Sequence, residues 1–378
     1  MCVRAIAILA ALVAVLAAAP SAGAAKRSVP QGFYGVMLDR GVADASPAVQ
    51  DAQFALMARS GVESVRTVFR WSEVQPNPGQ QPDLSRLDGL VTAASAHGVQ
   101  VLPVVMYAPR WARRNPDLGA SPPARAADYA AFLRQLVARY GPVGSFWAER
   151  PALPRRPLRT WQVWNEPELS YQWDVDRGAP GAYPGGYVTL LRAARRALRV
   201  ADRGSRVVLA GVTNDSWNEL RTLYRNGARG HFDVAAVQTY TGKPENVLRV
   251  LARVRTVMRR AKDPRRAVWI TELSWPAARG RTKVPRYHRS IVTSDGGMAA
   301  RLTRAYSLTA KRRRALGLGR LYWYTWASGY ERGESIFDYA GLGRFRAGQF
   351  RSKPALLAYT RSARRHQGCV KTSSGRCR

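Results

Sequence analysis

Short apolar segments alternate with amphipathic segments along most of this 378-residue chain. Eight of the apolar segments are rich in β-branched and aromatic residues, as buried strands are. Strands that alternate with helices form parallel sheets, and eight such units favour a closed barrel over an open sheet. We therefore predict an α/β fold, a single (β/α)8 TIM barrel. The expected strands cover residues 35–38, 62–68, 99–106, 160–167, 206–212, 233–238, 268–275 and 318–325.

The segments between these strands have the spacing of helices that bury one face. Glycines at 61, 98 and 141 follow the first three of them, as is typical of helix ends. No second domain or long linker is visible, so residues 26–364 are predicted to form one domain, with a basic tail at 365–378. The expected helices lie near residues 48–59, 83–97, 129–140, 187–200, 217–224, 247–258, 297–315 and 354–364.

The first 25 residues have the pattern of a secretory signal peptide. Arg4 precedes an apolar run at 5–19, and Pro20 and a stretch of small residues follow. The run is short for a membrane span. We expect the signal peptide at 1–25 to be removed and the protein to be secreted; the alternative is a retained N-terminal anchor.

The cysteines and histidines give no metal-binding pattern. Cys2 lies in the signal peptide, whereas Cys369 and Cys377 lie in the tail and are predicted to form a disulfide in an oxidising compartment. Two cysteines and four scattered histidines supply no ligand spacing. We expect neither a metal nor a cofactor.

The formal net charge is +35, and the basic residues cluster at 192–199, 253–266 and 311–314. One interpretation is solvated helix faces in an arginine-rich composition. The other is attraction to an anionic polymer, such as an acidic polysaccharide or a cell-wall phosphate. Because no nucleic-acid-reading module is present, we do not expect a nucleic-acid partner.

Two glutamates, Glu166 and Glu272, fall at the carboxyl ends of expected strands. A carboxylate there is costly unless it has a partner or a task, and the active sites of such barrels lie at this end. We therefore expect the two to share one site. Glycoside cleavage with retention requires such a pair, one protonated and one ionised.

The Trp-Asn-Glu-Pro segment at 164–167 and the Thr-Glu pair at 271–272 resemble the clan A glycoside hydrolases. These are retaining enzymes on eightfold barrels, and the likeness is greatest to family 5, the cellulase family, and to family 39. It extends from Gly35 to about residue 359. The resemblance implies that Glu166 is the acid/base and Glu272 the nucleophile.

The resemblance also implies substrate-binding and supporting residues around this pair. Arg66, on the second strand, would hold the nucleophile, with Arg70 as its competitor for that role. Asn165 would bind the sugar 2-hydroxyl, and Tyr240 would donate a hydrogen bond to Glu272.

Aromatic residues near the eighth strand are candidates for stacking on a sugar ring. Trp323 matches the family's platform, and Trp326 lies nearer the strand end. Alternation places them on opposite faces, so only one should line the site. Each tryptophan could instead pack in the core. Further candidates for a binding cleft are Trp111, Trp173 and Trp275.

The sequence departs from the family at two positions. Many members have histidine two residues before the tyrosine, where this chain has Gln238, and another after the third strand, where it has the segment 107–111. These differences put the substrate contacts of those groups in doubt, as well as membership of family 5. We expect Glu168 to be an exposed loop residue rather than a third catalytic carboxylate.

Together these features predict a secreted, monomeric, retaining glycosidase that acts on a β-linked oligo- or polysaccharide, neutral or acidic. One rival is a non-catalytic carbohydrate- or cell-wall-binding barrel, whose binding would survive loss of both glutamates. Another is a cell-surface binding protein that uses its arginine-rich faces. Binding by such a protein would depend steeply on the salt concentration and would not depend on Glu166.

Overall fold

The computed structural model describes residues 26–173, 181–213, 215–329, 333–347 and 349–368. The expected signal peptide at 1–25 and the expected disulfide between Cys369 and Cys377 lie outside the described residues. None of the helices in these ranges combines the length and the apolar character needed to cross a membrane.

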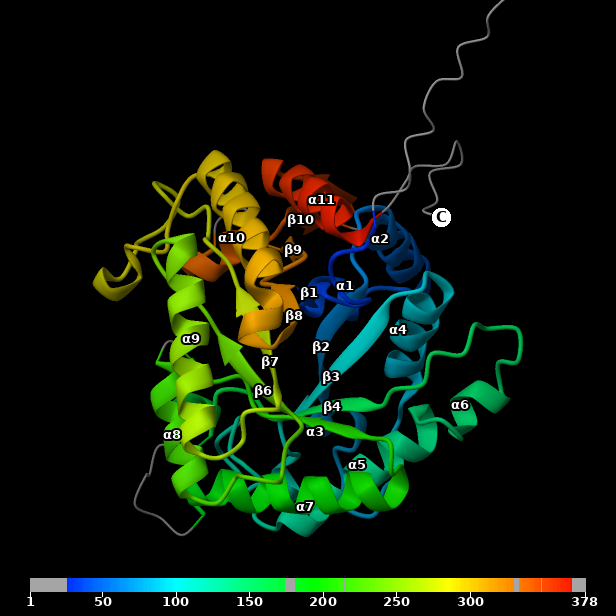
Figure 1. The fold of residues 1–378 in the computed structure, drawn as a ribbon. Coiled ribbons are helices and arrows are strands. Elements are labelled where there is room, and N and C mark those ends of the chain that lie inside the picture. The colour runs from blue at the N-terminus through cyan, green and yellow to red at the C-terminus, as the bar shows by residue number, and fades with distance from the viewer. Residues whose placement is uncertain (1–25, 174–180, 214, 330–332, 348, 369–378) are drawn as a thin grey trace, which may run out of the picture.

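Eight parallel strands form a closed barrel in chain order, at the centre of the ring of helices in Figure 1. The first and last strands pair with each other, with Gly35 opposite Tyr322, and so close the barrel. This confirms the predicted TIM-barrel fold. The strands are β1 (Tyr34–Leu38), β2 (Ser64–Arg70), β3 (Gln100–Met106), β4 (Thr160–Val163), β5 (Arg206–Val208), β6 (Val234–Gln238), β7 (Ala267–Leu273) and β8 (Leu318–Trp323).

Helices surround the barrel on its outside (Figure 1). In the described ranges, eight α-helices correspond to the predicted helical segments, and three single-turn α-helices lie in the connections. The long helices are α2 (Pro47–Arg59), α4 (Ser85–Ala96), α5 (Ala126–Tyr140), α7 (Gly185–Ala201), α8 (Ser216–Arg225), α9 (Pro244–Arg260), α10 (Asp295–Leu316) and α11 (Pro354–Gln367). The short ones are α1 (Arg40–Ala43), α3 (Trp71–Val74) and α6 (Ser145–Ala148).

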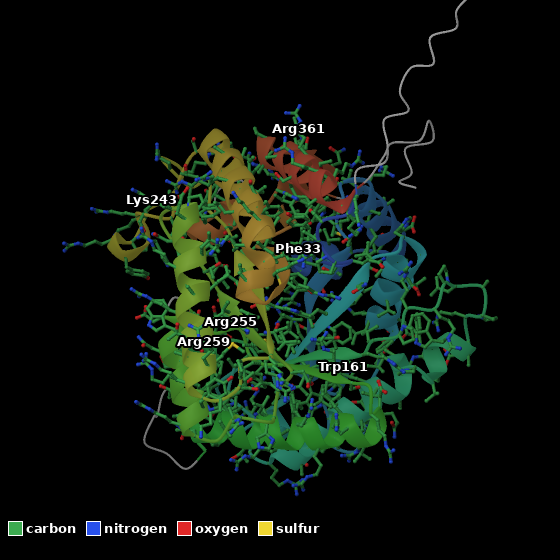
Figure 2. The ribbon with its side chains drawn as sticks, in the orientation of Figure 1. Phe33, Trp161, Lys243, Arg255, Arg259 and Arg361 are labelled. Atoms are coloured by element: carbon green, nitrogen blue, oxygen red, sulfur yellow. The ribbon has the colours of Figure 1, made fainter. Side chains whose placement is uncertain are left out.

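The core has two layers, one inside the barrel and one between the strands and the helices. Phe33 and Trp161, labelled in Figure 2, are fully buried in the outer layer. Gly35 allows the inner layer to pack closely, since a Cβ there would lie 2.6 Å from the Tyr322 ring. The inner layer consists of Leu102, Val208, Val234, Ala236, Trp269 and Tyr322.

A small three-stranded sheet follows the barrel and was not predicted. It consists of β9 (Ala327–Ser328), β10 (Gly343–Arg346) and β11 (Gln349–Ser352). These strands have only two to four residues, too few for a periodic pattern to be recognised. The sheet covers the end of β8, where Phe350 stacks on Trp326 at a ring-centroid distance of 4.9 Å.

The last helix extends beyond the predicted domain boundary at 364. It ends at Gln367, before Gly368, which has a left-handed backbone (φ 72°). The Gln367 amide donates to the Gly61 carbonyl at 2.7 Å, and the Ser28 N–H donates to the His366 carbonyl at 2.9 Å. Residues 365–367 therefore belong to the barrel, and the predicted start of the tail is too early.

The buried face of α5 provides a test of this packing. Leu133 is fully buried in the outer layer, whereas its neighbour Arg134 is exposed. Leu133→Ala is expected to lower the free energy of unfolding by about 2–5 kcal/mol, because it leaves a cavity. Arg134→Ala is the matched control and should change it by less than about 0.5 kcal/mol. Denaturant titration measures both, and equal effects would contradict the assigned face.

Candidate active site

A cavity of about 290 Å³ opens at the carboxyl ends of the barrel strands. Glu166 follows β4 and Glu272 lies in β7, and both side chains line this cavity. Residues far apart in the sequence therefore meet at the end of the barrel where such folds carry their sites. Other predicted site residues in its lining are Arg66 and Asn165.

The Glu272 carboxylate is held by hydrogen bonds to both of its oxygens. Arg66 Nη1 donates to Oε1 at 2.7 Å, and the Tyr240 hydroxyl donates to Oε2 at 2.7 Å. The side chain is nearly buried, so these donors replace the water that would otherwise solvate the charge. The structure thus places Arg66 and Tyr240 at the carboxylate that they were predicted to contact.

Arg66 connects several side chains at the floor of the cavity. Its guanidinium donates to Glu272, to Asn165 Oδ1 at 2.6 Å and to Gln162 Oε1 at 2.8 Å. It is 1% exposed, so its position is fixed by these partners and by the surrounding strands. Arg70, the competing candidate, lies instead over the ring of Tyr107, 4.7 Å from its centroid.

Asn165 has a defined amide orientation. Its oxygen accepts from Arg66 and, at 3.0 Å, from Gln238 Nε2. Within the described part of the chain, its amide nitrogen donates to no protein acceptor, so the NH₂ group is free to bind a ligand hydroxyl. Gln238 occupies a position where the family often has histidine, and here it orients Asn165.

The backbone around Glu166 is held in an unfavourable conformation. Trp164 and Glu166 have positive φ angles of 66° and 46°, which side-chain-bearing residues rarely adopt and which cost roughly 1–2 kcal/mol each. The Trp164 N–H donates to the Val105 carbonyl at 3.1 Å, and the Glu166 N–H donates to the Gly211 carbonyl at 3.0 Å. Such conformations persist where neighbouring strands fix the chain, commonly at functional sites.

Two backbone features bring the strands together beneath these side chains. Gly211 leaves no room for a side chain, since a Cβ there would lie 2.8 Å from Thr271 Oγ1 and 2.9 Å from Gln238 Nε2. The register between β6 and β7 shifts after Val237, which places Gln238 opposite Glu272. A bulge of this kind commonly redirects side chains beside an active site.

The two glutamates have different electrostatic environments. Burial raises the pKa of Glu166 well above its usual value, and the negative charges of Glu272 and Glu168 raise this pKa further, while Arg66 lowers it. Glu272, in contrast, receives two hydrogen bonds, one of them from a cation. The site can therefore hold one carboxyl group protonated beside one that is ionised, as acid/base chemistry requires.

Glu168 does not have the exposed position that was predicted for it. Its side chain is buried, and Oε1 accepts a hydrogen bond from the Thr213 N–H at 2.6 Å. Burial raises the pKa of Glu168 to about 7. The segment after β4 folds back onto the segment after β5, a long-range contact for which the sequence carries no local signal.

The prediction that Trp323 or Trp326 lines the site is wrong. Both side chains are fully buried. Trp323 Nε1 donates to the Ala340 carbonyl at 3.0 Å, and Trp326 Nε1 donates to Gln53 Oε1 at 3.0 Å. The segment after β8 covers Trp323, and the small sheet covers Trp326, so neither ring has a face open to a sugar.

The other tryptophans proposed for a cleft also pack in the core. Trp173 and Trp275 are buried, and the partly buried Trp111 packs edge-on against Trp71 at a ring-centroid distance of 5.6 Å. None of these three is among the residues that line the cavity. Tyr324, directly after β8, lines it instead.

Asp39 is a cavity residue that the sequence analysis missed. It follows β1 directly, and burial raises its pKa to about 7, although the neighbouring Thr325 side chain lowers this pKa. Asp39 could have been found by the signal that identified Glu166, a carboxylate that follows an apolar strand. Within the described ranges, no group of three or more histidine, cysteine, aspartate or glutamate side chains is arranged to hold a metal ion.

No family model matches the sequence, and no curated protein matches it. The fold, however, is shared with solved structures of glycoside hydrolases. A family 39 glycoside hydrolase from Bacteroides cellulosilyticus WH2 has a TM-score of 0.66 and 18% identity, covering 89% of this chain and 64% of that one. A monomeric β-xylosidase from Caulobacter crescentus CB15 has a TM-score of 0.62 and 16% identity, covering 89% and 69%.

A family 5, subfamily 18 protein from Streptomyces cattleya, solved in complex with Manβ1-4GlcNAc, is also similar. Its TM-score is 0.64 and its identity 18%, covering 88% of this chain and 80% of that one. At these identities the similarity establishes the fold. The structural neighbours come from the two families that the sequence motifs resemble.

The buried Glu168 predicts a pH dependence of stability. Its pKa is about 7 in the folded state against an ordinary 4.5, so the folded state binds this proton more tightly than the unfolded state. The contribution of Glu168 to the free energy of unfolding is then fully present below about pH 4.5 and is lost as the pH rises to about 7. Glu168→Gln should reduce this loss by roughly 3 kcal/mol.

Denaturant titrations of the wild type and the variant between about pH 4 and pH 8 measure this difference. Glu334→Gln, at an exposed position, is the control and should change stability by less than about 0.5 kcal/mol. If Glu168→Gln and the wild type lost stability in parallel, Glu168 would not be the group responsible.

Proposed function

We propose that this chain is a retaining glycoside hydrolase that cleaves β-linked oligo- or polysaccharides by double displacement. The observation that carries the proposal is one cavity whose lining includes Glu166 and Glu272, two carboxyl groups in contrasting environments. The fold similarity to family 39 and family 5 enzymes supports it. Retaining enzymes require this pair.

In the first step, Glu166 donates its proton to the glycosidic oxygen while a Glu272 oxygen attacks the anomeric carbon. The bond between that carbon and the glycosidic oxygen breaks, and a glycosyl ester on Glu272 forms. The raised pKa of Glu166 keeps the proton available. Arg66 and Tyr240 orient the attacking carboxylate through the hydrogen bonds to its two oxygens.

In the second step, Glu166, now a carboxylate, takes a proton from a water molecule whose oxygen attacks the anomeric carbon. The bond to Glu272 breaks, and the carboxylate is restored. The free NH₂ group of Asn165 would donate to the sugar 2-hydroxyl, because Arg66 and Gln238 occupy its oxygen. Such contacts strengthen in the transition state.

We further propose that the enzyme is exported and acts as a monomer. The sequence of residues 1–25 supports export, since a charged start, an apolar run and small residues follow one another there.

The structural neighbours named above include a β-xylosidase and a protein bound to a β-linked disaccharide. They are the reason for placing the substrate among β-linked sugars.

Loss of either glutamate should have a distinct effect on hydrolysis. Glu272→Ala is expected to reduce turnover to background, since no nucleophile remains. Glu166→Gln should slow cleavage about 10²–10⁴-fold for substrates with poor leaving groups, and less for activated aryl glycosides, which need no proton. Steady-state kinetics on a panel of aryl glycosides and β-linked polysaccharides measures both.

The exposed Glu245→Gln is the matched control and should retain full activity, and circular dichroism should show that all variants are folded. An unchanged rate in Glu272→Ala would refute the enzyme assignment. If the wild type bound oligosaccharides without turnover and both variants did so equally well, the chain would be a carbohydrate-binding barrel.

The pH profile should report the ionisation of Glu166. The value of kcat/KM is expected to fall as the pH rises through the pKa of Glu166, because the proton for the leaving group is lost. Glu168→Gln removes a nearby negative charge that raises this pKa. The alkaline limb should therefore move to lower pH in that variant, and a limb that stayed in place or moved upward would contradict the assignment.

A further inference from the structure

Several arginine side chains gather around a groove that is separate from the active-site cavity. A groove of about 570 Å³ lies between α8 and α9. Arginine side chains at 221, 225, 229 and 260 line it, together with Tyr224, and no carboxylate is part of its lining. A concave surface that gathers several cations without an anion attracts anionic ligands.

Asp263, which contacts the groove residue Tyr224, is already engaged. Asp263 accepts a hydrogen bond from the Tyr224 hydroxyl at 3.0 Å and lies 3.4 Å from Arg266 Nε. Across the described part of the chain, the four groove arginines form no ion pair, although Arg229 donates to the Lys262 carbonyl at 2.9 Å. Their charges are therefore available to a ligand.

Basic residues extend this surface beyond the groove itself. Arg192 on α7 donates to the Gly227 carbonyl at 3.4 Å, which brings α7 to the end of α8. Arg259, labelled on α9 in Figure 2, is exposed beside Arg260. A strip of charge wider than one groove suits an extended polymer better than a single small anion.

Helix capping explains only part of this arrangement. Arg225 and Arg260 are the last residues of α8 and α9, where a cation stabilises the helix dipole by about 0.3–1 kcal/mol. Arg221 lies a turn earlier, and Arg229 lies beyond the helix. Gathering four like charges around one groove is unfavourable without a counter-ion, so a structural role does not account for it.

The groove lies toward the end of the barrel opposite the active-site cavity. It is lined by residues near the carboxyl ends of α8 and α9, and β6 and β7 begin shortly after these ends. The active-site cavity, in contrast, lies where the strands end. A ligand in the groove therefore leaves the cavity open.

We propose that the groove between α8 and α9 binds an anionic polysaccharide through its carboxylate groups and so tethers the protein to it. Guanidinium groups bind carboxylates in a bidentate geometry. Nucleic acid is less favoured, since Arg253 covers the nearby Trp217 ring, 4.5 Å from its centroid, and, among the described residues, Tyr224 is the one aromatic side chain in the groove lining. The choice of a polysaccharide rests on the proposed glycosidase function.

The test compares two variants that each lose four positive charges. One replaces Arg221, Arg225, Arg229 and Arg260 with glutamine. The matched control replaces Arg312, Arg314, Arg361 and Arg365, which are exposed on α10 and α11. Binding to polygalacturonate is measured by calorimetry at about 50 and about 200 mM salt. A single-stranded DNA oligonucleotide is the competing probe, and a neutral galactan is the control polymer.

The groove variant is expected to bind polygalacturonate about tenfold more weakly and with a smaller salt dependence, whereas the control variant should bind within about twofold of the wild type. Neutral galactan should not bind. Hydrolysis of an aryl glycoside should be unchanged in both variants, because the groove lies away from the cavity. The binding measurement does not depend on hydrolysis. If the protein proved not to be a glycosidase, the effect of the groove variant on binding could still be measured.

Three outcomes would overturn the proposal. Equal losses in the two variants would show attraction by overall charge rather than by the groove. An unchanged affinity in the groove variant would show that the groove is not the site. Tighter binding of the oligonucleotide than of polygalacturonate, lost in the groove variant, would assign the groove to nucleic acid.

Discussion

The buried guanidinium of Arg66 is the interaction on which the organisation of the active site depends. It binds Glu272 on β7 and Asn165 after β4, and it is almost completely shielded from water. Removing one partner of such a pair costs about 3–5 kcal/mol, because an uncompensated charge remains. The same cation moderates the pKa of Glu166, so one residue on β2 sets both the geometry and the protonation of the site.

The residues that were located correctly from the sequence share one property. Arg66 lies in β2, Glu272 lies in β7, and Glu166 follows the short strand β4. In a parallel barrel all strands point the same way, so their carboxyl ends meet at one end of the barrel. The closed barrel therefore brings these segments to one site, where Arg66 contacts Glu272. Asp39 satisfies the same criterion after β1 and lines the same cavity, so it was within reach of this reasoning.

The residues that were misplaced depend on contacts between distant segments. Trp323 is covered by the segment around Ala340, and Trp326 by the short strand that carries Phe350. Strand alternation describes the two faces of β8 but not what later packs on them. Glu168 is buried because a loop after β4 meets the segment after β5. Neither covering segment has a periodic pattern, so local sequence could not reveal these contacts.

The opposite directions of strands and helices in the barrel have an evolutionary consequence. Loops that leave the strands shape the catalytic pocket, while loops that leave the helices shape the far end, where the arginine-lined groove lies. Insertions at one end need not disturb the other, since the closed barrel lies between them. The residues around the cavity and those around the groove can therefore change independently during evolution.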